Sequence, residues 1–129
     1  MINALIVDDS RLARKRLKDV LENIQELKCS SILEAVDGVD GLNKYKELKP
    51  NLIITDIEMP NMDGITMIQE IHKIDEEVNT IVVSSVANEQ VKQMIKTDPF
   101  TSYFKKPLKE NALDVQLLKI KNRLEKKSF

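Results

Sequence analysis

Residues 49–64 read Lys49-Pro50-Asn51-Leu52-Ile53-Ile54-Thr55-Asp56-Ile57-Glu58-Met59-Pro60-Asn61-Met62-Asp63-Gly64. Leu52–Ile54 is apolar, rich in β-branched side chains and preceded by the turn signal Pro50-Asn51, so it predicts a buried strand. A strand that is apolar at successive positions is typical of a parallel sheet covered on both faces. Asp56 follows the end of this strand, which is the edge where open α/β sheets bind ligands.

A strand followed by a polar turn and an amphipathic helix recurs along the whole chain. The predicted strands are Ala4–Val7, Ile32–Val36, Leu52–Ile54, Ile81–Val83 and Ser102–Lys105. The predicted helices follow the N-cap Ser10 as far as Ile24, cover Val39–Leu48 and Ile65–Ile74, run from the N-cap Asn88 to Pro99, and begin again near Leu108. This alternation predicts an α/β fold, a doubly wound five-stranded parallel sheet of flavodoxin-like order 2-1-3-4-5.

Composition limits the classes of function. The 129 residues suit one domain, and the net charge of −1 gives no global attraction to nucleic acid. The single cysteine, Cys29, excludes an internal disulfide and fits a reducing compartment. No basic segment precedes a long apolar one, and no apolar run is long enough to span a membrane. We therefore expect a cytoplasmic protein with neither nucleic acid as a partner nor membrane insertion.

Three carboxylates are predicted to converge. Asp8 and Asp9 follow the first strand, Asp56 follows the third, and these strands are neighbours in the predicted order. Two such charges about 4 Å apart repel by roughly 4 kcal/mol at an effective dielectric constant near 20, so the cluster needs a proton or a cation. Oxygen ligands at a half-open cleft suit Mg²⁺. With Lys106 and Ser84 at the ends of the fifth and fourth strands, this arrangement suits transfer of a phosphoryl group to a carboxylate.

The chain resembles the receiver domains of two-component response regulators, including single-domain chemotaxis-type regulators. The resemblance covers essentially all 129 residues and rests on five segments in order: Leu5-Ile6-Val7-Asp8-Asp9-Ser10, Glu34-Ala35-Val36-Asp37-Gly38, Asp56 to Gly64, Val83-Ser84-Ser85 and Lys105-Lys106-Pro107. Each segment alone is a weak signal, whereas all five at family-like spacing are a strong one.

The resemblance assigns roles to individual residues. It implies that Asp56 is the phosphoacceptor and that Mg²⁺, for which Mn²⁺ or Ca²⁺ can substitute, is held by Asp9 directly and by Asp8 through water. Asp56 and the backbone carbonyl of Glu58 complete the protein ligands. Further matches are Ser84 as the phosphoryl-binding hydroxyl, Lys106 as the phosphoryl-pairing cation with a cis bond to Pro107, Tyr103 as the aromatic switch residue, and Glu58 and Val86 as residues that tune phosphoryl lifetime.

The resemblance also implies partners. A histidine kinase or phosphotransfer protein is expected as the donor. A target protein is expected on the face formed by the fourth helix, fifth strand and fifth helix. The segment Lys96-Thr97-Asp98-Pro99-Phe100 departs from the Gly-Ala usual in the family and is expected to add stiffness and apolar bulk beside that face. Because Val86 is apolar and cannot orient an attacking water, we expect slow self-dephosphorylation.

Several alternatives remain open from the sequence. One domain over residues 1–129 without an output domain is expected, and the basic last helix ending at Ser128-Phe129 favours a natural terminus. The chain is then expected to act by protein contact, with chemotaxis or motility as one setting, and without independent enzymatic turnover. A phosphorelay intermediate and a receiver cut from a transcription regulator are the alternatives. From other classes, an aspartyl-nucleophile phosphatase would use Glu58 as its second acid, and a flavin-binding module would need a phosphate loop where Asp8 and Asp9 repel phosphate.

Overall fold

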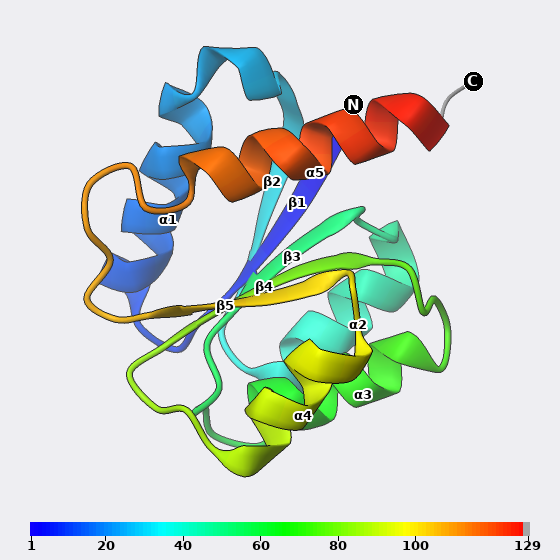
Figure 1. Cartoon of the computed structure of the whole chain (residues 1–129). Coiled ribbons are helices and arrows are strands. Elements are labelled where there is room, and N and C mark those ends of the chain that lie inside the picture. The colour runs from blue at the N-terminus through cyan, green and yellow to red at the C-terminus, as the bar shows by residue number, and fades with distance from the viewer. Residues whose placement is uncertain (128–129) are drawn as a thin grey trace.

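The computed structural model describes residues 1–127, and these residues form one three-layer α/β domain (Figure 1). The strands are β1 (Ile2–Val7), β2 (Cys29–Ala35), β3 (Leu52–Thr55), β4 (Asn79–Ser84) and β5 (Thr101–Lys105). The helices are α1 (Arg11–Asn23), the short 3₁₀ helix η1 (Gln25–Leu27), α2 (Gly38–Leu48), α3 (Gly64–His72), α4 (Glu89–Thr97) and α5 (Asp114–Lys127). The predicted end of the last helix at Ser128-Phe129 lies outside the described residues.

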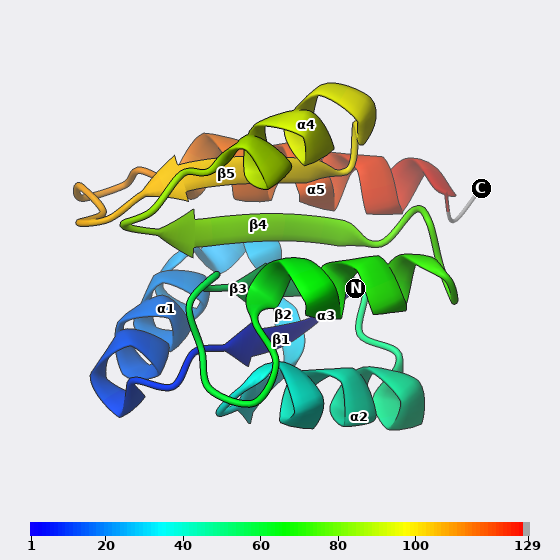
Figure 2. The ribbon, with the colours of Figure 1, turned by 90° about the horizontal axis from the view of Figure 1, so that it is seen from below.

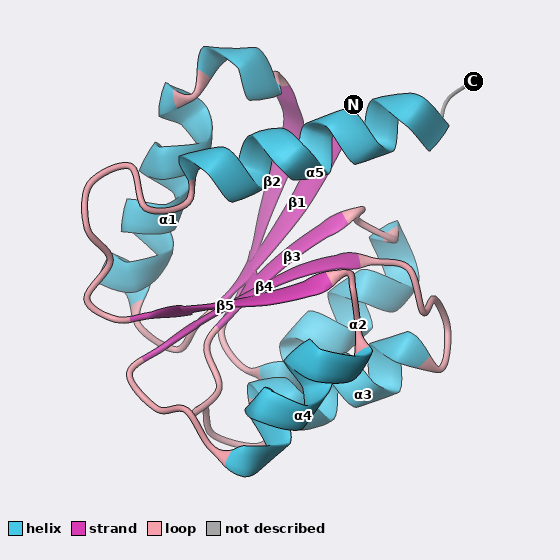
Figure 3. Cartoon of the chain, in the orientation of Figure 1, coloured by secondary structure: helices cyan, strands magenta, loops and turns pink. Residues whose placement is uncertain are grey.

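All five strands are parallel, and their order is β2-β1-β3-β4-β5, which confirms the predicted topology. Helices α1 and α5 cover one face of the sheet, and α2, α3 and α4 cover the other (Figures 1 and 2). The alternation of strand, loop and helix along the chain is plain when the ribbon is coloured by secondary structure (Figure 3). Strands β1, β3 and β4 lie inside the sheet and are buried at nearly every position, and each holds one of the apolar runs of the sequence.

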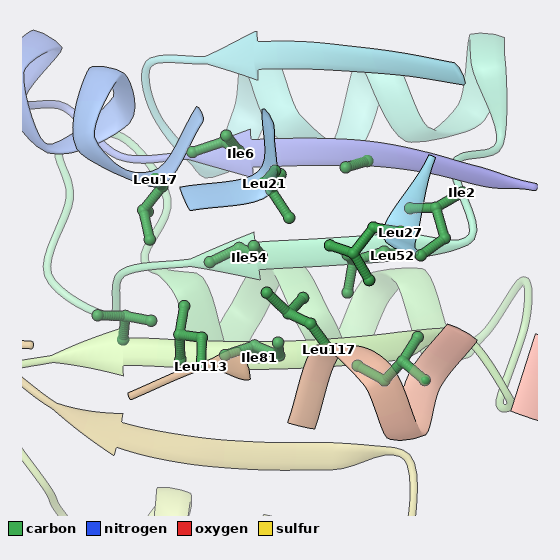
Figure 4. Close-up of a cluster of buried hydrophobic side chains, with 13 residues drawn as sticks. Ile2, Ile6, Leu17, Leu21, Leu27, Leu52, Ile54, Ile81, Leu113 and Leu117 are labelled. Atoms are coloured by element: carbon green, nitrogen blue, oxygen red, sulfur yellow. The ribbon is translucent and has the colours of Figure 1, made fainter. Parts of the chain in front are cut away.

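Each face of the sheet has its own apolar core. On the α1 and α5 side, Ile6 and Ile54 of the strands pack with Leu17, Leu21 and Leu117 of the helices (Figure 4). On the opposite side a second cluster joins the strands to α2, α3 and α4, and includes Leu5, Ile53, Tyr45, Met67, Ile68, Ile71 and Val91. Because apolar side chains are buried against helices on both faces, the sheet is held in place. The end of each strand is therefore held in a fixed position relative to its neighbours.

Three predicted boundaries are wrong. The second strand ends at Ala35, and Val36 lies beyond it with half its surface exposed. Helix α3 ends at His72 because the next residues turn, with the N–H groups of Ile74 and Asp75 both bonding to the carbonyl of Ile71, which leaves Ile74 exposed. The last helix begins at Asp114 and not near Leu108, because Asn111 has a left-handed φ of 62° that a helix does not accept.

Other local predictions are confirmed. Ser10 caps α1 by accepting a hydrogen bond from the N–H of Ala13, and Asn88 caps α4 by accepting one from the N–H of Val91. The bond between Lys106 and Pro107 is cis. Phe100, expected to add apolar bulk before the last strand, is half-buried, and the Arg123 guanidinium lies 5.0 Å from its ring centre.

Tyr45 provides an alkaline probe of the second core. Its side chain is 2% exposed, and burial together with the charge of Asp75, 3.4 Å from its hydroxyl, raises the pKa of Tyr45 to about 12. The unfolded chain loses this proton near pH 10, the ordinary pKa of tyrosine, so the folded state is the one that keeps it between these two pH values. The contribution of Tyr45 to stability is therefore complete below pH 10 and declines as the pH rises toward 12.

We expect Tyr45→Phe to flatten the loss of stability with rising pH over this window. Urea unfolding at several pH values from 9 upward measures the slope for the variant and for wild type, with about 1.4 kcal/mol per pH unit as the largest contribution of one group. Tyr103→Phe serves as the control, since the chain has only two tyrosines. Equal slopes for Tyr45→Phe and wild type would contradict the assignment.

Candidate functional site

The register of the sheet brings the acidic residues together. Val7 of β1 is paired with Thr55 of β3, so Asp8 and Asp56 come next on neighbouring strands at the carboxyl edge of the sheet. The N–H of Asp56 donates to the carbonyl of Val7 at 3.0 Å, which extends the pairing by one step. Candidate ligand atoms of Asp8, Asp9 and Asp56 all lie within 4.8 Å of one another. The predicted convergence of three carboxylates is therefore observed in the structure.

The three carboxylates differ in exposure and in partners. Asp8 is buried, and its carboxylate accepts the N–H of Ser10 at 2.9 Å and the Lys106 ammonium at 3.0 Å. Asp56 is half-buried, and its two oxygens accept the N–H of Ile57 at 2.6 Å and Lys106 at 3.0 Å. Asp9 is exposed, and its carboxylate has no hydrogen bond or ion pair within residues 1–127.

Lys106 reaches this cluster from the end of β5. Its Nζ atom lies 3.0 Å from a carboxylate oxygen of each of Asp8 and Asp56. Burial lowers the pKa of Lys106, but the hydrogen bonds and charges of the two carboxylates raise it by more, so the net shift is upward. Lys106 is consequently a permanent cation at neutral pH, and it bridges two of the three acids.

The donor set fits a divalent cation of the Mg²⁺ class. Three carboxylates face one ammonium, so the cluster has an excess of two negative charges, and one of the acids has no partner in the protein. Mg²⁺ takes few protein carboxylates and keeps several waters, which suits a site that is open at Asp9 and closed at Asp8. Lys106 bridges two acids at a hydrogen-bonding distance, which leaves the third acid free to bind a metal ion.

The remaining predicted residues surround this cluster. Ser84 is buried at the end of β4, and its hydroxyl accepts the N–H of Val86 at 3.2 Å. The Tyr103 hydroxyl donates to the carbonyls of Ser84 and Val86 at 3.1 and 3.3 Å, so β5 is tied to the loop after β4. Glu58 is exposed in the loop after Asp56. The predicted place of Ser84 at the end of the fourth strand is confirmed, whereas the bonds from Tyr103 to backbone carbonyls were not anticipated from the sequence.

Arg14 of α1 braces the acidic loop, a role that the sequence alone did not reveal. One guanidinium nitrogen donates to the backbone carbonyl of Asp8 at 2.8 Å, and another donates to the Glu34 carboxylate at 3.1 Å. The spacing of Arg14 from Asp9 carries no motif that would have revealed this contact. A groove of about 800 Å³ adjoins the site, between α1 and the connection from β5 to α5, and it shares Lys106 with the acidic cluster.

His72 is half-buried on α3, and its Nε2 atom lies 3.2 Å from the Asp98 carboxylate. His72 does not belong to the acidic cluster, and its ion-pair partner within residues 1–127 is the carboxylate of Asp98. No helix of the described chain is both long and apolar enough to cross a membrane.

Comparison with known proteins agrees with this geometry. The chain is 40% identical over 88 residues to the chemotaxis protein CheY of Bacillus subtilis. The aligned region covers 67% of this chain and 70% of that protein. It is 39% identical over 89 residues to a protein-glutamate methylesterase/protein-glutamine glutaminase of Methanospirillum hungatei, and there it spans only a quarter of the relative's length.

A chain of the crystal structure of the CheX–CheY–BeF₃–Mg²⁺ complex from Borrelia burgdorferi superposes with a TM-score of 0.76 at 30% identity, covering 91% of this chain and 86% of that one. The family model of the response regulator receiver domain matches residues 4–118, which include the acidic cluster, Ser84 and Lys106. The chain therefore belongs to the response regulator receiver domain family.

Proposed function

We propose that Asp56 accepts a phosphoryl group in a reaction that requires Mg²⁺ bound by Asp8, Asp9, Asp56 and the backbone carbonyl of Glu58. The observation that carries this proposal is the cluster of three carboxylates within 4.8 Å, two of which share the Lys106 ammonium. Lys106 already supplies one positive charge beside Asp56, and the proposed Mg²⁺ would supply a second. Such a carboxylate is suited to receive a phosphoryl group, because the oxygens of that group develop negative charge during transfer.

The chemistry is a single displacement at phosphorus. A carboxylate oxygen of Asp56 forms a bond to phosphorus while the bond from phosphorus to the donor atom breaks, and the donor keeps that electron pair. The donor is a phosphohistidine of a histidine kinase or phosphotransfer protein, and the product is an acyl phosphate. Mg²⁺, when bound, neutralises charge on the phosphoryl oxygens. Lys106 supplies a fixed positive charge to the same oxygens, and the Ser84 hydroxyl donates a hydrogen bond to one of them.

The switch follows from the bonds around Ser84. When the Ser84 hydroxyl turns toward the phosphoryl group it gives up its bond from the N–H of Val86, and the loop after β4 moves. Tyr103 is bound to the carbonyls of that loop, so the movement reaches β5 and the adjoining face of α4, β5 and α5. We assign this face to a downstream target protein, with phosphorylation shifting an equilibrium between two states. The chain has no independent turnover substrate in this proposal.

Intact mass tests the proposal. After incubation with acetyl phosphate and Mg²⁺, wild type is expected to gain the mass of one phosphoryl group, with acetate as the other product. Omission of Mg²⁺, or the Asp56→Asn substitution, is expected to abolish the gain. The Glu58→Gln variant, which keeps the backbone carbonyl, is expected to be phosphorylated like wild type. A gain that persists in Asp56→Asn would contradict the proposal, and steady release of phosphate from a phosphomonoester would support the aspartyl-nucleophile phosphatase alternative.

The decay of the same mass peak measures phosphoryl lifetime. Val86 and Glu58 flank the proposed site, and the apolar Val86 side chain has no group that can orient an attacking water. We therefore expect the phosphorylated protein to persist for minutes or longer in Mg²⁺ without an added phosphatase. A half-life of seconds would refute the role assigned to Val86.

A further inference from the structure

The loop after Asp56 is fixed at both ends and less constrained between them. The N–H of Gly64 donates to the carbonyl of Ile57 at 2.8 Å and so joins the two ends of the loop, and near its second end the carbonyl of Met62 accepts the N–H of Gly38 at 3.0 Å. Within residues 58–63 of the described chain, Asn61 has the only side chain that bonds to a segment outside this loop and α3.

Asn61 bonds to the turn that begins α2. Its Nδ2 atom donates to a carboxylate oxygen of Asp37 at 2.7 Å, while the other Asp37 oxygen accepts the N–H of Asp40 at 2.8 Å. Asn61 has a φ of 68°, in the left-handed region that asparagine and glycine accept best. The turn between β2 and α2 therefore holds the loop through one side chain and one backbone bond.

Asp37 is suited to anchor this bond. Its residue is only 8% exposed, and hydrogen bonds from the N–H of Asp40 and from Asn61 lower the pKa of Asp37 against the opposing effect of burial. It is ionised at neutral pH, so its bond from Asn61 is charge-assisted and stronger than one between neutral groups. The anchor also caps α2, which connects it to a rigid element of the fold.

We propose that Asn61 is a positioning residue for the metal site: by bonding to Asp37 it sets the path of residues 58–60 and thereby aims the backbone carbonyl of Glu58 at the cation. This inference rests on the proposed function, in which that carbonyl is a ligand. Glu58 lies between Ile57 and Asn61, which are both held by hydrogen bonds. The Glu58 side chain is exposed and, within the described chain, makes no hydrogen bond to a segment outside the loop. Groups that orient metal ligands typically change metal affinity by about 10- to 100-fold when they are removed.

Asn61→Gly removes the side-chain amide that bonds to Asp37 but keeps the backbone conformation, because glycine accepts a φ of 68°. Asn111→Gly is the matched control, since Asn111 also has a left-handed φ, 62°, but lies in the connection between β5 and α5. We expect Asn61→Gly to weaken Mg²⁺ binding about tenfold in a titration of backbone amide chemical shifts, and Asn111→Gly to leave it unchanged. Phosphorylation of Asn61→Gly by acetyl phosphate should then need about tenfold more Mg²⁺ for half its maximal rate.

An exchange of donor and acceptor tests the bond itself. Asn61→Asp places two carboxylates face to face and is expected to move the loop, whereas adding Asp37→Asn restores a bond in the reverse direction at unchanged net charge. Asparagine caps helices about as well as aspartate, so α2 keeps its cap in the double variant. The double variant is expected to recover the phosphorylation rate of wild type at subsaturating Mg²⁺, and the Asn61→Asp variant is expected to lose most of it.

The outcomes separate a failure of the positioning role of Asn61 from a failure of the proposed function. If wild type binds Mg²⁺ and Asn61→Gly binds it equally well, the positioning role is wrong while the proposed function stands. If Asn61→Gly and Asn111→Gly weaken binding to the same extent, loop flexibility explains the effect and the role is again wrong. If wild type neither binds Mg²⁺ nor is phosphorylated, the proposed function fails and this inference fails with it. Thermal unfolding of each variant confirms that it is folded at the temperature of the titration.

Discussion

Lys106→Met is expected to bind Mg²⁺ more tightly than wild type while losing phosphorylation. The ammonium of Lys106 lies 3.0 Å from an oxygen of both Asp8 and Asp56, so it already neutralises part of the charge that attracts a metal ion. Methionine has a similar length and no charge. Without the ammonium, three carboxylates within 4.8 Å depend on the metal ion alone, and their mutual repulsion adds to the free energy of Mg²⁺ binding.

The size of the increase follows from screening. A charge pair about 4 Å apart is worth roughly 4 kcal/mol at an effective dielectric constant near 20. Lys106 keeps 29% of its side chain exposed, and water and rearrangement cancel much of that energy. We expect a residual effect of about 1 to 2 kcal/mol, which is a roughly tenfold lower dissociation constant for Mg²⁺.

Phosphoryl transfer is expected to move in the opposite direction. Lys106 is the only protein cation bonded to Asp56 within residues 1–127, and it is positioned before the reaction begins. Removing one such preorganised group costs about 10²- to 10³-fold in rate. The measurement is the initial rate of mass gain with acetyl phosphate at saturating Mg²⁺, together with the Mg²⁺ dissociation constant by chemical shift titration. Lys109→Met, three residues further along and exposed, is the control. A rate like that of wild type would show that Lys106 only stabilises the empty cluster, and weaker Mg²⁺ binding would contradict the competition between Lys106 and the metal ion.

The sheet order and the convergence of the acids were predictable because both follow from the most buried segments. The strands that end in Asp8 and Asp56 are apolar at nearly every position, and only a central place in a parallel sheet explains that pattern. Their adjacency then follows from the flavodoxin-like order 2-1-3-4-5, whose switch point lies between the first and third strands. The register of Val7 with Thr55 confirmed what this topology required.

The errors lie where local backbone geometry competes with apolar spacing. The run that includes Leu113 and Leu117 has helical periodicity, but Asn111 is left-handed and delays the helix to Asp114. Periodicity does not report the φ of a single residue. The bond between Asn61 and Asp37 was missed for a related reason, because it joins two turns 24 residues apart and each residue alone reads as ordinary turn chemistry.

Gly64→Ala is expected to cause the largest loss of stability of any substitution considered for this chain. A Cβ atom at Gly64 falls 1.9 Å from the backbone carbonyl oxygen of Asp56 and 3.0 Å from its carbonyl carbon. Both atoms belong to the backbone at the end of a buried strand, so no side-chain rotation relieves the overlap. The bond from the N–H of Gly64 to the carbonyl of Ile57, 2.8 Å long, must break when either segment shifts.

Gly41→Ala is the matched comparison, since Gly41 is also buried and also helical. A Cβ there meets the Met67 sulfur at 2.6 Å and the Val7 methyl groups at 3.1 and 3.2 Å, all side-chain atoms. Met67 is unbranched and adjusts more easily than a backbone does, and alanine in a helix gains up to about 1 kcal/mol over glycine. We expect Gly41→Ala to cost at most about 2 kcal/mol.

For Gly64→Ala we expect a loss of at least about 3 kcal/mol, beyond the usual range of overpacking because the obstruction is backbone. In a domain of this size such a loss lowers the melting temperature by on the order of 10 °C. The same shift moves Asp56 relative to Asp8 and Lys106, so the folded fraction should also bind Mg²⁺ and accept a phosphoryl group poorly. Thermal unfolding of both glycine variants and phosphorylation well below their melting temperatures measure the two effects. A Gly64→Ala variant as stable as Gly41→Ala would mean that the end of β3 is free to move, and the fixed geometry of Asp56 on which its proposed chemistry depends would then be wrong.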